Sequence, residues 1–357
     1  MKKFIIFLIM ILLIIGITVY FTNGKKLISS LDDNKIYKIN NQEVTEIKTL
    51  DVCEFFSKGI ITYNNQKIAF MDYNNNLIWE NDNRVFTDNI YIGENYIYKC
   101  LENSVEIIDK NNQSYVVTEI QGEIINVSRE NNKTYIITKQ NNGQNSLYML
   151  NEHNEVIVEN KQFDELITGI SINDKSEGYS LNTLKYSNGK LINTLSYNLI
   201  DDMELWSKTI EDEIIIKVKV LNNNVLVIGT ENIYFFNSNG SLMWKNSNYN
   251  KIRDYEINEK DQRIYILYKQ DEKSELLGYN FEGKVKEIYK LPESTNKFDI
   301  FNNKIFTYNE NSISVLHDNK IDTLIEDNNS QITDFYVDNN NKIYLLSKDK
   351  IIQGQIK

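Results

Sequence analysis

Proline, arginine and histidine are scarce in this chain of 357 residues, which has one proline and two histidines. Its four arginines are scattered along the sequence, which argues against anion recognition by clusters of bidentate arginine side chains. The two histidines, His153 and His317, fall in the turns of different predicted repeats, with no neighbouring ligand or triad motif. Because a zinc or Ser-His site needs several converging partners, we predict that both are surface turn residues.

Basic clusters are also missing outside the N-terminal region. The formal net charge is −11, and removal of four lysines (Lys2, Lys3, Lys25 and Lys26) leaves −11 − 4 = −15 for residues 27–357. Affinity for a phosphate backbone requires clustered lysine and arginine. The acidic body therefore excludes nucleic acid as an expected partner.

The chain has only two cysteines, Cys53 and Cys100, which fall in adjacent predicted repeats. Both lie in apolar, strand-like contexts, which favours two buried free thiols. An extracytoplasmic location would also permit a disulfide, so the sequence leaves their oxidation state open.

One long apolar run is present, from Phe4 to Phe21, after Lys2 and Lys3. Eighteen helical residues rise about 27 Å, close to the thickness of a bilayer core. The run leaves through Tyr20 without the small-residue pattern of a cleavage site, which favours an uncleaved anchor over a cleaved signal peptide. We predict a single-pass cell-membrane protein with a cytoplasmic N-terminus and an extracytoplasmic body.

The rest of the chain repeats one pattern: a short apolar strand, an Asn-rich turn and a second apolar strand. The clearest copy runs from Ile233 to Trp244, and related copies recur every 30 to 50 residues or so. This period is typical of a β-propeller with four short strands in each blade. Candidate inner hairpins begin near Ile68, Val105, Leu147, Tyr197, Ile233, Leu276 and Ile313.

An eighth set of strands, between Ile332 and Ile356, lacks a closing partner at its C-terminal end. A strand within Ile36 to Ile47 can supply it and thereby cover an exposed sheet edge. We therefore predict an all-β fold with an eight-bladed β-propeller, with seven blades as the alternative. The expected organisation is a cytoplasmic stub, anchor and flank at 1–26, a tether at 27–33 and the propeller at 34–357.

Three tryptophans give the repeats a resemblance to a known superfamily. Trp79, Trp206 and Trp244 each follow a strand–turn pattern similar to the tryptophan-docking repeat of pyrroloquinoline-quinone-type propellers, with Asn237, Gly240 and Trp244 as the best match. The resemblance implies that each tryptophan packs between neighbouring blades. The whole chain also resembles the uncharacterised, membrane-anchored propeller proteins of Gram-positive bacteria.

No residue is assigned a catalytic, cofactor-binding or metal-binding role, and no cofactor is expected. The Asp72-x-Asn74-x-Asn76 segment lacks the glycine and terminal glutamate of a calcium loop, so it is interpreted as a hairpin turn. The sequence favours a non-enzymatic platform that binds an unknown protein or cell-envelope component. A carbohydrate-binding or glycan-active propeller and a degenerate quinone-type dehydrogenase propeller are the alternatives.

Overall fold

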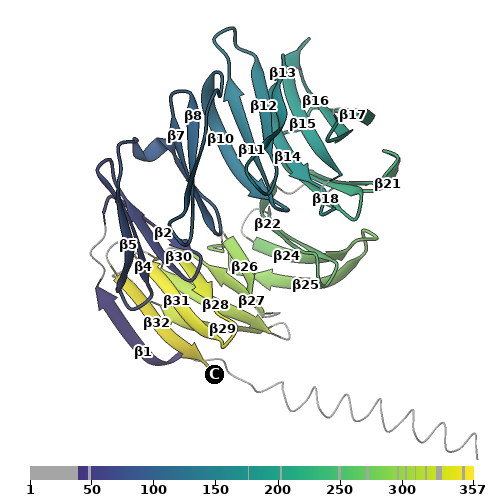
Figure 1. Ribbon diagram of the computed structural model, residues 1–357. Coiled ribbons are helices and arrows are strands. Elements are labelled where there is room, and N and C mark those ends of the chain that lie inside the picture. The colour runs from purple at the N-terminus through teal and green to yellow at the C-terminus, as the bar shows by residue number, and fades with distance from the viewer. Residues whose placement is uncertain are drawn as a thin grey trace, which may run out of the picture.

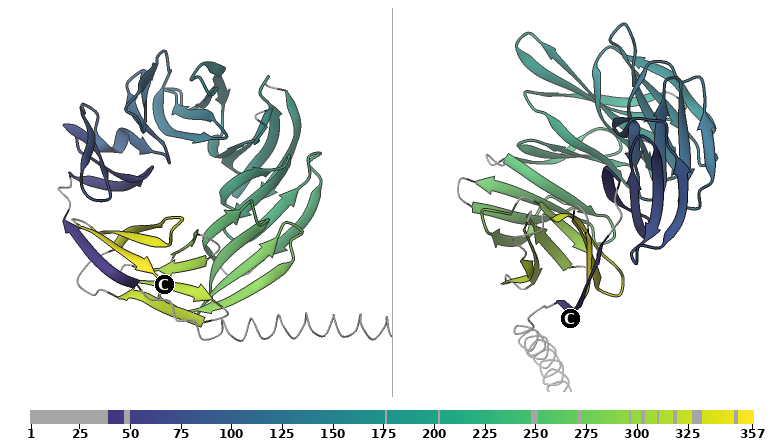
Figure 2. Two further views of the ribbon diagram at one scale, coloured as in Figure 1. Left: turned by 60° about the horizontal axis from the view of Figure 1, so that its bottom comes forward. Right: turned by 90° about the vertical axis from the view of Figure 1, so that its left-hand side faces the viewer.

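The computed structural model describes residues 39–46, 50–175, 177–201, 203–247, 251–270, 273–295, 297–301, 304–309, 311–317, 320–326, 332–347 and 350–357. Within these residues the chain forms eight antiparallel sheets of four strands each. The sheets are arranged radially around one axis as the blades of a propeller (Figures 1 and 2). The prediction of an all-β, eight-bladed propeller is therefore confirmed.

The first four blades take up the first part of the propeller. Blade 1 consists of β2 (Val52–Phe56), β3 (Gly59–Tyr63), β4 (Lys67–Asp72) and β5 (Leu77–Asp82). Blade 2 consists of β6 (Ile90–Ile92), β7 (Tyr96–Leu101), β8 (Ser104–Asp109) and β9 (Ser114–Val117). Blade 3 consists of β10 (Glu123–Glu130), β11 (Lys133–Lys139), β12 (Asn145–Leu150) and β13 (Val156–Phe163). Blade 4 consists of β14 (Leu166–Ile172), β15 (Gly178–Ser187), β16 (Lys190–Leu199) and β17 (Glu204–Glu211). A 3-10 turn, η1 (Thr87–Asn89), links blades 1 and 2.

The remaining blades complete the ring. Blade 5 consists of β18 (Ile215–Leu221), β19 (Asn224–Gly229), β20 (Asn232–Phe236) and β21 (Leu242–Ser247). Blade 6 consists of β22 (Lys251–Asn258), β23 (Arg263–Gln270), β24 (Lys273–Asn280) and β25 (Val285–Leu291). Blade 7 consists of β26 (Lys297–Phe301), β27 (Lys304–Tyr308), β28 (Ser312–His317) and β29 (Lys320–Glu326). Blade 8 consists of β30 (Ile332–Val337), β31 (Lys342–Ser347), β32 (Lys350–Ile356) and β1 (Ile39–Glu46).

Strands from both ends of the described chain close blade 8. β1 pairs antiparallel with β32, and Val44 lies opposite Ile352. The first strand thus becomes the outermost strand of the last blade, inside the window that the sequence predicted. This pairing covers the edge of β32 that would otherwise be exposed.

The predicted hairpins are real, but their place in the blade was wrong: they are the outer pairs of strands, not the inner pairs. The first strands of neighbouring blades contact one another, as β14 contacts β18 and β22 contacts β26. First strands therefore lie next to the axis, and the third and fourth strands lie at the periphery (Figure 2). The sequence pattern identified the outer hairpins because their turns have the most regular chemistry.

That turn chemistry recurs in blade after blade. The Oδ1 atom of Asn237 accepts hydrogen bonds from the backbone N–H groups of Asn239 (3.0 Å) and Ser241 (2.9 Å). The residue before Ser241 is Gly240, with a left-handed φ of 74°. In the corresponding turn of blade 1, Asp72 is the acceptor and Asn75 takes the left-handed position with a φ of 65°. Asparagine tolerates this conformation, so it replaces glycine in these hairpins.

The hydrophobic core is divided among the spaces between blades. Eight buried clusters are present in the described residues, and each joins two neighbouring blades. The cluster that joins blade 8 to blade 1 packs Ile60 against Leu346 and Ile351. Both faces of each blade are therefore buried, which explains strands that are apolar at consecutive positions, such as β19.

The predicted membrane anchor at Phe4 to Phe21 and the tether at 27–33 lie outside the described residues. In the part of the chain that the structure describes, no helix is both long and apolar enough to cross a membrane. The boundaries of the anchor and tether stay predictions.

Candidate functional site between blades 6 and 7

Each of the three tryptophans lies on the fourth strand of its blade and docks on the next blade. The indole N–H donates to a backbone carbonyl in the turn between the third and fourth strands of that blade. The acceptors are the carbonyls of Lys110 for Trp79 (3.2 Å), Ser238 for Trp206 (3.0 Å) and Phe281 for Trp244 (2.9 Å). The packing of these tryptophans between blades, which the resemblance implied, is confirmed.

Two glycines make room for the docked rings. A Cβ atom on Gly240 would lie 2.7 Å from Cδ2 of Trp206, and one on Gly283 would lie 2.6 Å from Cδ2 of Trp244. Both glycines also have left-handed φ angles. A side chain at either position is thus excluded twice, by backbone conformation and by the indole.

Blade 6 has a glutamate where these blades have a tryptophan. Trp244 lies seven residues after Asn237, the first residue of its turn, and pairs with Phe235. Glu287 lies seven residues after Asn280, which opens the equivalent turn, and pairs with Gly278 at the same register. The space between blades 6 and 7 therefore receives a carboxylate instead of an indole.

A cavity of about 620 Å³ lies at this position, within the range of small-molecule pockets, roughly 300–1,000 Å³. Its lining includes Asn258 and Asp261 from the turn between β22 and β23, and we call the end of the ring that carries the turns between first and second strands the front face. Blade 6 contributes Asn258, Asp261, Arg263, Tyr265, Glu287 and Tyr289, and blade 7 contributes Ile300, Lys304, Ile305, Leu316 and His317.

Glu287 is held in a fixed orientation at the side of this cavity. The hydroxyl groups of Tyr265 and Tyr289 both donate to its Oε2 atom, each at 3.1 Å. The Nε atom of Arg263 lies 3.6 Å from its Oε1 atom. Burial and the nearby Glu287 carboxylate raise the pKa of Tyr265, so its hydroxyl remains a neutral hydrogen-bond donor.

Tyr265 fits beside Glu287 because Gly278 lies opposite. A Cβ atom on Gly278 would be 3.0 Å from Cε1 of Tyr265 and 3.2 Å from Cβ of Glu287. The absence of a side chain at Gly278 thus allows the tyrosine ring and the carboxylate to lie together.

On the blade 7 side, His317 ends β28 and its Nε2 atom lies 2.7 Å from Oδ2 of Asp322 on β29. Only 13% of the His317 side chain and 17% of the Asp322 side chain is exposed. The prediction of a surface turn residue is therefore wrong for His317, because its side chain is largely buried at the end of β28 beside Asp322. It holds for His153, whose side chain is 74% exposed in the turn after β12.

A second group of charged residues lines the axis of the ring. Asp254, Glu256, Asp299 and Asp334 lie on the first strands of blades 6, 7 and 8. Burial raises the pKa of all four carboxyl groups, and that of Asp299 reaches about 7 because Glu256, Asp334 and Asp254 also repel its charge. Within the described ranges, no three His, Cys, Asp or Glu residues are arranged to hold a metal ion.

Another group of charged residues near the axis is neutralised by direct ion pairs. The Nζ atom of Lys219 on β18 lies 2.7 Å from Glu130 and 2.8 Å from Glu259. Glu130 also accepts a hydrogen bond from the backbone N–H of Ile172 (2.8 Å). These contacts connect blades 3 to 6, so we interpret this group as structural.

Aromatic residues at the front face stack on each other. The ring centroids of Tyr73 and Tyr344 are 3.9 Å apart, and Tyr336 lies 6.2 Å from Tyr73. Tyr344 is 7% exposed, so this stack belongs to the packed junction of blades 1 and 8. It is not an open row of rings for a sugar.

The two cysteines are free thiols in different inter-blade clusters. Cys53 packs at the junction of blades 8 and 1, and Cys100 at that of blades 2 and 3. Burial raises the pKa of both thiols to about 12, which keeps them unreactive as nucleophiles.

The fold and its docked tryptophans define an eight-bladed β-propeller of the tryptophan-docking kind. The chain belongs to DUF5711, a family of unknown function, whose model matches residues 18–355. No curated protein matches the sequence.

Two solved structures are similar in fold. BamB from Moraxella catarrhalis is 11% identical with a TM-score of 0.54, and the match covers 89% of this chain and 99% of BamB. Apo AztD from Citrobacter koseri is 10% identical with a TM-score of 0.50, over 90% of this chain and 98% of AztD. At this identity the likeness concerns the fold alone.

Proposed function

We propose that this protein is a membrane-tethered, non-enzymatic β-propeller that binds another protein through the outer edge of blades 4 to 6. Propellers commonly serve as interaction platforms. The observation that carries the proposal is an exposed row of apolar side chains on three neighbouring fourth strands.

This row, the outer apolar edge, consists of residues that are each 44% to 56% exposed. Its members are Met203 and Leu205 at blade 4, Leu242 and Met243 of β21, and Val285 and Ile288 of β25. Leu242 and Met243 both face water because β21 bulges at Met243, between Leu242, which pairs with Phe236, and Trp244, which pairs with Phe235. Exposed apolar residues on an edge strand are unfavourable in isolation. The fourth strands of blades 1 and 2 also expose such residues but carry no lysine, so the combination of apolar residues with lysines distinguishes the outer apolar edge.

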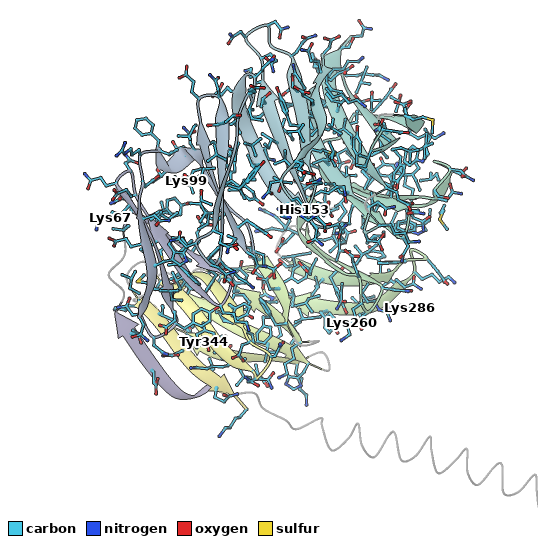
Figure 3. All side chains as sticks on the ribbon, in the orientation of Figure 1. Lys67, Lys99, His153, Lys260, Lys286 and Tyr344 are labelled. Carbon is cyan, nitrogen blue, oxygen red and sulfur yellow. The ribbon has the colours of Figure 1, made fainter. Side chains whose placement is uncertain are left out.

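Lysines alternate with these apolar residues. Lys245 on β21 and Lys286 and Lys290 on β25 are exposed, and Figure 3 labels Lys286 at the periphery. The body of the protein is strongly acidic, so this local basic character is distinctive. It fits an extended partner segment that carries both acidic and apolar side chains, aligned along the free edge of a fourth strand.

The proposed location follows from the apolar run of residues 4–21, with the N-terminus in the cytoplasm and the propeller outside. A reporter enzyme that is active only outside the cytoplasm, fused after Lys357, tests this orientation. Activity supports it, and an inactive but intact fusion contradicts it.

Site-specific photo-cross-linking in the native cells tests the binding surface. We expect a cross-linker at Met243 or Ile288 to capture one and the same protein, and Met243→Glu to abolish its capture from position 288. The matched control is Tyr186, which is 72% exposed near the end of β15, the second strand of blade 4. Equal capture from all three positions would contradict the proposed surface.

A further inference from the structure

We propose that the cavity between blades 6 and 7 is a binding site for a neutral saccharide unit. This site is separate from the outer apolar edge and does not depend on a protein partner. The first observation that supports this proposal is the residue at the docking position of blade 6. Glu287 stands there in place of a tryptophan and leaves the space between blades 6 and 7 open.

The comparison between blades shows what the substitution changes. Behind Trp206 and Trp244 the indole occupies the gap and donates to the next blade. Glu287 is shorter and its carboxylate is turned toward Tyr265 and Tyr289 of its own blade. The gap that an indole fills elsewhere is therefore available to a ligand.

The lining has the two kinds of surface that a sugar requires. Apolar and aromatic groups from Ile300, Leu316 and Tyr289 can pack against the C–H faces of a pyranose ring. Polar groups that can pair with hydroxyls stand beside them, from Glu287, Arg263 and Asn258. Such side chains provide both donors and acceptors, as hydroxyl groups need.

Arg263 adds directional donors that its protein contacts use weakly. Its Nη1 atom lies 3.4 Å from the carbonyl oxygens of Asp261 and Gln262, and its Nε atom lies 3.6 Å from Glu287. All three contacts are longer than a typical N–H···O bond. A ligand oxygen at normal distance would improve the hydrogen bonding of this guanidinium group.

The charges of the lining favour a neutral ligand over an anion. Arg263 contributes positive charge, and Glu287 and Asp261 contribute negative charge, whereas the ammonium group of Lys304 donates to Asn341 of blade 8. The excess of carboxylates disfavours an anion, whereas a polyol can use each group as a hydrogen-bond partner.

The test is binding of the neutral disaccharides diacetylchitobiose and cellobiose to full-length protein in detergent micelles. Saturation-transfer NMR detects contact and calorimetric titration measures affinity, with inorganic phosphate as the anionic comparison. We expect saturation transfer to at least one disaccharide, and at least tenfold weaker binding for Glu287→Trp, which restores the docking residue and fills the cavity.

Two controls keep this result interpretable. Tyr115 pairs with Ile107, two residues before Asp109, at the matching register in blade 2, so Tyr115→Trp should leave binding unchanged. Arg263→Met should weaken binding without an indole in the cavity, and the melting temperature of each variant reports its folding. Binding of phosphate but neither sugar, no binding at all, or undiminished binding by folded Glu287→Trp would each overturn the proposal.

Discussion

Replacement of Asp299 by asparagine is expected to stabilise the propeller at alkaline pH. Asp299 lies on β26 beside the axis, half-buried, and near the carboxyl groups of Glu256 and Asp334. Burial, followed by repulsion from these carboxylates, raises its pKa from 3.8 to about 7, although Lys297 partly opposes the shift. The charged form is thus unfavourable in the folded state.

The sign of the pH dependence follows from linkage. The folded-state pKa is above the unfolded-state value, so the folded protein takes up a proton as the pH falls from 8 toward 5 while the unfolded chain does not. Stability from this group therefore increases on acidification. A shift of about three pKa units corresponds to about 4 kcal/mol, and partial access to water reduces our expectation to about 2 kcal/mol.

Asp299→Asn removes the charge with little change in shape. We expect its free energy of unfolding to exceed that of the wild type by about 2 kcal/mol at pH 8.5, and by less than about 1 kcal/mol at pH 5. Urea unfolding of the full-length protein in detergent, followed by tryptophan fluorescence, measures both values.

The matched control is Asp51→Asn, at an exposed position before β2. Surface substitutions of this kind usually change stability by less than about 0.5 kcal/mol. If Asp299→Asn brings no gain at pH 8.5, or if its gain grows as the pH falls, the reasoning about this carboxylate is refuted.

Two further predictions concern tryptophan docking and the thiols. Gly240→Ala should lower the free energy of unfolding in urea by about 3 kcal/mol, because the new Cβ meets Trp206. The control Gly143→Ala should lower it by only about 1 kcal/mol, since Gly143 has a similar positive φ but open space around it. Equal losses would show that the indole contact contributes nothing. Burial raises the pKa of Cys53 and Cys100 to about 12, so both should react with iodoacetamide at pH 8 at least tenfold more slowly in the folded than in the urea-unfolded protein. Mass spectrometry measures the extent of alkylation. Rapid alkylation of the folded protein would contradict the burial of these thiols.

Much of the fold could be predicted because its signals are local. An Asp or Asn that caps its own turn, followed by a residue with a left-handed backbone, marks the outer hairpin of several blades. Apolar strands on either side complete the pattern, and the unmatched strands at the two ends of the repeat predict the closure through β1 and β32. The inner strands have less distinctive turns, so their order within the blade became clear only in the structure.

The candidate site could be predicted only in part. Counting seven residues from Asn280, as from Asn237 to Trp244, would have identified Glu287 as the departure from the repeat. Nothing near His317 in the sequence indicates that its side chain is buried, or that it lines the same cavity as Arg263. These residues are far apart along the chain and meet because two blades pack side by side.

The sequence by itself determined the repeated hairpins and the tryptophan-docking pattern, because each depends on residues within one turn or one repeat, and it favoured eight blades over seven. The tertiary structure decided which residues of different blades meet, and so created the cavity beside Glu287 and the carboxylates around Asp299. Contacts between blades depend on the curvature and closure of the whole ring, which no single repeat encodes.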